Sequence, residues 1–173
     1  IGQVHAGRLN NGDEVVIKII KNDYIRTFQR DLRRMRRWIK IGLLVYPPLR
    51  RVGNPMGLLD HIEDYTMREL DLRNEIMGCA ILEKSLKILN DSGFVISKLS
   101  FPKMYPDLSN SNILVMEKIN APTLQTHLEQ ETFSWKDMLE LFRIHGAFMF
   151  GLGRFHGDLH PGNSMLAKNG MFT

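Results

Sequence analysis

The chain has 173 residues, of which 43% are hydrophobic and 24% charged, a composition typical of a folded domain that excludes a disordered chain. The formal net charge is +4, but residues 21–51 contain ten basic and two acidic residues, so the rest of the chain sums to −4. Such local basicity argues against a nucleic-acid-binding protein, and no apolar run reaches the roughly 18 residues of a membrane-spanning helix.

The first elements predicted along the chain are a β-hairpin and an amphipathic helix. Residues 3–9 and 14–20 have β patterns and flank the turn-forming run Asn10-Asn11-Gly12-Asp13, which predicts the hairpin. Apolar residues then recur at spacings of three and four, which predicts a helix whose opposite face is rich in arginine. These apolar residues are Ile25, Phe28, Leu32, Met35 and Ile39.

The remaining elements alternate between helices and short strands. We expect one long helix over residues 63–89, since this stretch contains no proline. It includes Cys79, and a single cysteine excludes an internal disulfide. Two strands at 101–105 and 113–119, a short helix at 122–131 and a helix capped by Ser134 that runs to about Arg154 come next, followed by a loop and a terminal hairpin. This order predicts an α+β protein with a small sheet-bearing lobe before a helical lobe.

The strongest chemical signal is the run His156-Gly157-Asp158-Leu159-His160-Pro161-Gly162-Asn163 after the last helix. In kinase-like phosphotransferases, an aspartate and an asparagine five residues apart orient the attacking group and hold a metal ion on the phosphates. Carboxylate and amide oxygens are hard ligands that suit Mg²⁺. The alternative is a turn built from common turn formers.

A second signal is Lys18, which lies near the end of the apolar strand 14–20. A strand lysine of this kind contacts the α and β phosphates of a nucleotide in kinases and pairs with a helix glutamate, for which Glu75 is the candidate. Taken alone, Lys18 could instead extend its ammonium group to solvent. Glu75 could likewise belong to a solvated helix face, with supporting pairs such as Glu69 and Arg73.

Four segments occur in the order seen in UbiB-type (ADCK-type) atypical kinases, and the chain resembles that family over nearly its whole length. They are Ile1-Gly2-Gln3-Val4-His5, Val16-Ile17-Lys18, Glu69-Leu70-Asp71 and Phe155 to Asn163. The resemblance implies a protein-kinase-like two-lobed fold, incomplete at both ends, with residues 1–119 as the first lobe and hinge and 120–173 as the start of the second lobe.

The resemblance also implies roles for individual residues. Lys18, Gln3 and Val16 would contact ATP, and the backbone of Met116-Glu117-Lys118 would contact adenine. Asp158, Lys18 and Glu75 would be catalytic, Asn163 would bind Mg²⁺, and Glu69 and Asp71 match the family's acidic motif.

The implied function is ATP hydrolysis or phosphoryl transfer that supports ubiquinone (isoprenoid quinone) biosynthesis. The family's K-x-G-Q segment and the D-F-G aspartate do not occur in these 173 residues, so we expect the chain on its own to be inactive. Two alternatives remain: an aminoglycoside- or choline-kinase-like small-molecule phosphotransferase, and a pseudokinase scaffold.

The arginine-rich helix suggests an anionic membrane surface as a partner, because a basic face beside an apolar face with Trp38 suits anionic lipid. The alternative is a solvated helix packed on the kinase core. The resemblance implies quinone-biosynthesis proteins or lipids as further partners, and no nucleic acid. It implies a cytoplasmic or peripheral membrane location in a bacterium and a mitochondrial or plastid location in a eukaryote.

Overall fold

The computed structural model describes residues 2–48, 53–154, 157 and 159–173. The chain divides into two compact units, each made of several segments. The first comprises Ile1–Gly7, Val16–Glu75 and Tyr105–Val115, and the second comprises Arg8–Val15, Ile76–Met104 and Met116–Thr173. In the described part of the chain, no helix combines the length and the apolar character needed to cross a membrane.

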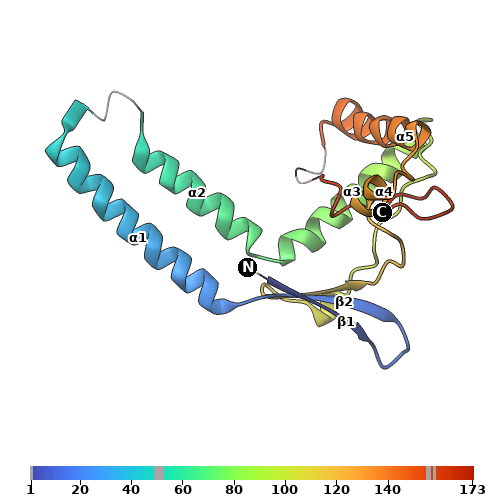
Figure 1. Ribbon diagram of the computed structural model, residues 1–173, viewed down its shortest axis with the longest axis horizontal. Coiled ribbons are helices and arrows are strands. Elements are labelled where there is room, and N and C mark those ends of the chain that lie inside the picture. The colour runs from blue at the N-terminus through green and yellow to red at the C-terminus, as the bar shows by residue number, and fades with distance from the viewer. Residues whose placement is uncertain (1, 49–52, 155–156, 158) are drawn as a thin grey trace. The chain divides into compact units, whose positions relative to one another are not determined.

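A three-stranded antiparallel sheet in the order β1-β2-β3 contains the predicted hairpin (Figure 1). Strands β1 (Gly2–Arg8) and β2 (Glu14–Ile20) are joined by a turn in which Gly12 has a φ of 94°, a conformation that favours glycine. Strand β3 (Ile113–Glu117) runs antiparallel to β2. The predicted strand over 101–105 is reduced to one bridge between Met104 and Met116.

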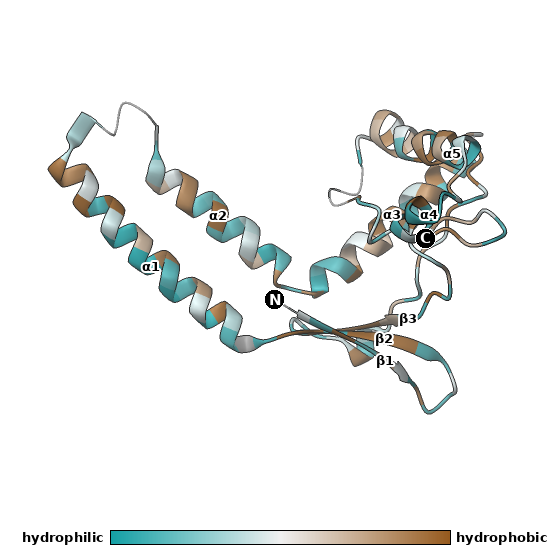
Figure 2. Ribbon diagram, viewed as in Figure 1, coloured by the Kyte–Doolittle hydropathy of each residue, from teal (hydrophilic) through white to brown (hydrophobic). Residues whose placement is uncertain are grey.

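Helices α1 (Asn22–Val45) and α2 (Pro55–Glu69) lie side by side in the first unit (Figure 1). Leu32 and Leu59 are each 3% exposed, and Arg36 bonds Asp60 at 2.5 Å and Glu63 at 2.6 Å. The predicted apolar face of α1 is thus buried at Leu32, but Met35 is 50% exposed. The apolar residues that follow leave a second hydrophobic stretch at the C-terminal end of α1 (Figure 2).

The prediction of a single long helix over 63–89 is wrong, because the helix is interrupted between α2 and α3 (Arg73–Asp91). Leu70 and Leu72 on either side of Asp71 are 5% and 0% exposed, so burying both leucines favours a bend over a continuous helix. Asp71 also bonds the backbone N–H of Arg73 through Oδ1 at 3.1 Å, which competes with helical hydrogen bonding.

The second unit has a hydrophobic core beneath the helices α4 (Leu124–Glu129) and α5 (Trp135–Gly146). Its buried residues are Leu89, Ile96, Leu124, Ile144, Phe148, Leu166 and Phe172. Ser134 caps α5 as predicted, and Asp137 completes a reciprocal capping box. The helix predicted to reach Arg154 ends earlier, and a π-helical turn, η3 (Ala147–Gly151), follows it.

Candidate nucleotide-binding site

Strand β2 and helix α3 bring Lys18 and Glu75 together within the first unit. Lys18 Nζ donates a short hydrogen bond to Glu75 Oε1, so the predicted ion pair is present. The two side chains are 35% and 40% exposed, which leaves both accessible to a ligand. A lysine that is already paired is held in one orientation, and its remaining N–H groups can donate to phosphate oxygens.

Glu75 owes its position to its place in the first turn of α3, three residues after the break in the helix. Its N–H donates to Leu72 O at 3.2 Å, and Leu72 is fully buried. The helix therefore begins on an anchored residue, with the glutamate directed to the sheet. A continuous helix over 63–89 would not have this anchor at the same point.

The acidic motif residues Glu69 and Asp71 lie at the junction of α2 and α3. Glu69 is the exposed last residue of α2. Asp71 makes an ion pair with Arg73, with Oδ2 2.6 Å from Nη2, and this partner lowers the pKa of the Asp71 carboxyl group. Asn74 Nδ2 donates to Arg68 O at 2.8 Å, which links the first turn of α3 to the last turn of α2. The Asp71 side chain thus holds Arg73, the first residue of α3, in this structure.

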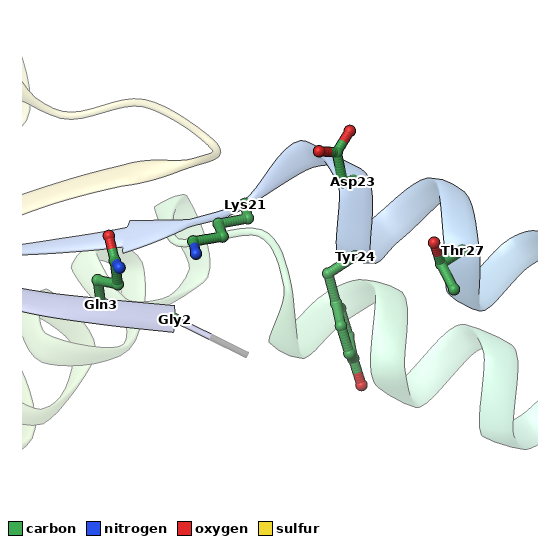
Figure 3. A pocket seen from close by; sticks show the side chains of 6 residues that line it. All are labelled: Gly2, Gln3, Lys21, Asp23, Tyr24 and Thr27. Carbon is green, nitrogen blue, oxygen red and sulfur yellow. The ribbon is translucent and has the colours of Figure 1, made fainter.

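Of the residues predicted to contact ATP from the sheet, Gln3 is exposed on β1 and Val16 is partly buried on β2. Gln3 lines an open hollow where β2 passes into α1, together with Gly2, Lys21, Asp23, Tyr24 and Thr27 (Figure 3). Neither Lys18 nor Glu75 lines this hollow. The hollow therefore does not coincide with the ion pair.

The segment Met116-Glu117-Lys118, predicted to contact adenine, lies in the second unit at the end of β3. Glu117 N donates to Lys103 O at 2.8 Å, and Lys118 N donates to Glu14 O at 3.1 Å. The N–H groups of Glu117 and Lys118 are therefore used within the protein, and the adenine contact of this segment stays a prediction.

The loop predicted to be catalytic is described in part, and Asp158 lies outside the described residues. Asn163 is exposed, and its Oδ1 accepts the His160 N–H at 3.1 Å. The Ser164 hydroxyl lies 3.5 Å from the same oxygen. An amide oxygen is a hard ligand that suits Mg²⁺, so the residue type fits one metal ligand. Among the described residues, no group of three or more His, Cys, Asp or Glu side chains could hold a metal ion.

The turn at Asn110, Ser111 and Asn112 contacts both elements of the ion pair, a role that the sequence did not predict. Ser111 O accepts the Leu72 N–H at 3.0 Å, and Asn112 O accepts the Ile20 N–H at 2.8 Å. The polar run Ser109-Asn110-Ser111-Asn112 signals a turn. No local pattern shows which distant backbone groups this turn will contact.

The sheet is small and antiparallel, its second strand carries a lysine, and this lysine pairs with a glutamate on α3. Together these features define a protein-kinase-like domain. The Rv3197 protein of Mycobacterium tuberculosis, solved as a complex with erythromycin, has the same fold with a TM-score of 0.76. It is 24% identical to this chain, and the match covers 99% of this chain and 41% of that protein.

Residues 1–173 match the ABC1 atypical kinase-like domain, and the chain belongs to this family. Similar curated proteins are named "Probable protein kinase UbiB". The one from Sodalis glossinidius is 32% identical over 166 residues, and the one from Vibrio vulnificus strain YJ016 is 32% identical over 167 residues. Each match covers 94% of this chain but only 29% of the relative. The chain therefore spans less than a third of the length of these relatives.

Proposed function

We propose that this chain is the ATP-binding part of a UbiB-type atypical kinase or ATPase. The Lys18–Glu75 pair is the observation that carries the proposal, because a strand lysine fixed by a helix glutamate is how kinases hold the α and β phosphates. In this proposal Asp158 orients the attacking group and Asn163 holds Mg²⁺, which would neutralise charge on the phosphates.

The biological setting in the proposal is isoprenoid quinone biosynthesis. It rests on the resemblance to UbiB-type kinases and on the names of the similar proteins. Membership of the ABC1 family favours this assignment over an aminoglycoside- or choline-kinase-like enzyme. A pseudokinase scaffold remains the competing function, because it would keep the fold and the ion pair without turning over ATP.

The decisive experiment replaces Lys18 with methionine in the full-length parent protein. The full-length protein is used because this chain covers only 29% of each similar curated protein. Lys18→Met removes the charge but keeps much of the side-chain volume. We expect MgATP affinity to fall by about tenfold or more, since a charge-assisted contact with phosphate is lost.

Lys103→Met is the matched control. Lys103 also forms an ion pair from the sheet region, with Nζ 3.7 Å from Asp13 Oδ2, but it has no predicted contact with ATP. Equal MgATP affinity in the Lys18 and Lys103 variants would overturn the assignment of Lys18. Binding of MgATP without turnover in the unmutated parent would favour the scaffold.

A further inference from the structure

The side chain of Asn110 makes two backbone hydrogen bonds within the turn before β3, to which Ser109 and Ser111 also contribute side-chain hydrogen bonds. Asn110 Oδ1 accepts the backbone N–H groups of Asn112 at 2.9 Å and Ile113 at 3.0 Å. The Asn110 N–H donates in turn to Ile113 O at 2.7 Å. Since one carboxamide oxygen fixes two successive amides, the directions of the intervening carbonyl groups are fixed as well.

The two carbonyl groups accept hydrogen bonds from β2, which carries Lys18, and from the residue before α3, which carries Glu75. Asn112 O accepts the N–H of Ile20, two residues beyond Lys18 at the end of β2. Ser111 O accepts the N–H of Leu72, three residues before Glu75. A single turn therefore connects the strand of the lysine with the start of the helix of the glutamate, and all of these residues belong to the first unit.

The burial of Ile20 and Leu72 makes the hydrogen bonds of their N–H groups important for the fold. Ile20 is 5% exposed and Leu72 is 0% exposed, so their N–H groups would be costly to leave without acceptors. The contact of Asp71 with Arg73 lies within the helix junction and does not reach the sheet. Asn110 itself is exposed, so its replacement leaves the core intact.

We propose that Asn110 is a positioning residue, which holds the turn that fixes β2 against α3 and thereby keeps Lys18 and Glu75 in contact. The functional consequence rests on the proposed nucleotide-binding role of the pair. Asn110 acts through backbone carbonyl groups and does not touch the nucleotide.

The test uses the full-length parent, three single variants, and Asn110→Ala made in a Glu75→Gln background. Asn110→Ala removes the acceptor, and Asn110→Asp restores an acceptor oxygen at the same position. Asn11→Ala is the matched control, because Asn11 Oδ1 also accepts a backbone N–H, that of Asp13 at 3.1 Å, in the β1–β2 turn. Hydrogen exchange is measured at the amides of Ile20 and Leu72, and MgATP affinity is measured for each protein.

We expect Asn110→Ala to speed exchange at both amides by about tenfold, because the turn opens more often. Asn110→Asp and Asn11→Ala should exchange at these two amides as the parent does. MgATP affinity should fall about fivefold in Asn110→Ala. In a Glu75→Gln background the same change should cost less than about twofold, since the pair is already broken and coupled residues are non-additive.

Two results would overturn the proposal. Unchanged exchange at Ile20 and Leu72 in Asn110→Ala would show that the turn does not hold the two elements. An equal loss of MgATP affinity with and without Glu75 would show that Asn110 acts on the fold in general and not through the pair. If the unmutated parent binds no MgATP, the proposed function fails, and the exchange measurement still decides whether the turn joins β2 to α3.

Discussion

Cys79 is a buried thiol on the inner side of α3, 8% exposed, with Sγ 3.9 Å from Pro102 O. Burial, with a smaller contribution from the negative charge of Glu83, raises the pKa of the Cys79 thiol to about 11. The thiolate is the reactive form, so this cysteine is protected both by its pKa and by its lack of access. It fits the apolar packing of the helix, in line with a structural role.

We expect iodoacetamide to label Cys79 at pH 8 at least about 100-fold more slowly in the folded parent than in denaturant. Because the pKa is raised, the rate in the folded protein should keep rising from pH 9 to about 11, the pKa of the buried thiol, whereas the denatured chain should level off earlier. The measurement is mass spectrometry of the Cys79 peptide over a pH series. Equal rates in the folded and denatured protein would show that the thiol is exposed.

Asp158 is the residue on which the proposed chemistry depends most. Asp158→Asn in the full-length parent should lower ATP turnover by about 10²–10⁴, because a positioned acid–base group is lost. MgATP affinity should change little, since Asp158 acts on the attacking group and not on the nucleotide. Steady-state ATPase kinetics and equilibrium binding measure the two quantities separately.

Asp91→Asn serves as the control for this change, because Asp91 is an exposed carboxylate at the end of α3. It should leave turnover unaltered. Full activity in Asp158→Asn would support the simpler interpretation that the run from His156 to Asn163 is only a turn.

Among the elements, α1 has an unusual surface, because exposed basic and exposed apolar side chains lie next to each other on it. Its basic residues Arg33 and Arg37 are exposed, and Trp38, Ile41 and Val45 are 72%, 50% and 77% exposed beside them. Part of the apolar face predicted for packing is buried against α2, so these later residues form a second apolar stripe. A basic face next to an exposed apolar stripe suits an anionic membrane surface, which we propose as a partner of α1.

We expect the parent to sediment with vesicles that contain anionic lipid and less with neutral vesicles. Arg33→Glu with Arg37→Glu should weaken this binding by at least about 2 kcal/mol, or roughly thirtyfold, from the loss of two basic contacts. High salt should remove most of the binding, because the Debye length falls to about 3 Å at 1 M. A residual salt-resistant fraction should depend on Trp38, since apolar insertion is not screened.

Lys84→Glu with Lys87→Glu provides the control, because both lysines are exposed on α3 and carry the same change in charge. Equal loss of binding in the two double variants would assign the attraction to net charge and not to α1. No binding to either kind of vesicle at low salt would leave α1 as a solvated helix packed on the domain.

At the scale of the whole molecule, local patterns in the sequence determined several features. The β1–β2 hairpin, the Ser134 cap and the ion pair of Lys18 with Glu75 follow the predictions. Turn residues, caps and an apolar period act over a few neighbouring positions, so they can be read from the chain itself. The prediction of the ion pair came from the order of the family's segments. That order identifies the strand and the helix but does not place them in space.

The tertiary structure decided the break between α2 and α3, the weak pairing of 101–105 and the contacts of the Asn110 turn. Without proline or glycine at Leu70-Asp71-Leu72, helix propensity favours continuation, and the burial of two leucines in the fold overrides it. The Asn110 turn bonds Ile20 and Leu72, which lie far from it in sequence. Sequence alone determined the β1–β2 turn and the Ser134 cap, because their hydrogen bonds are local. Long-range burial and hydrogen bonding divided the predicted long helix into α2 and α3 and determined which elements the Asn110 turn contacts.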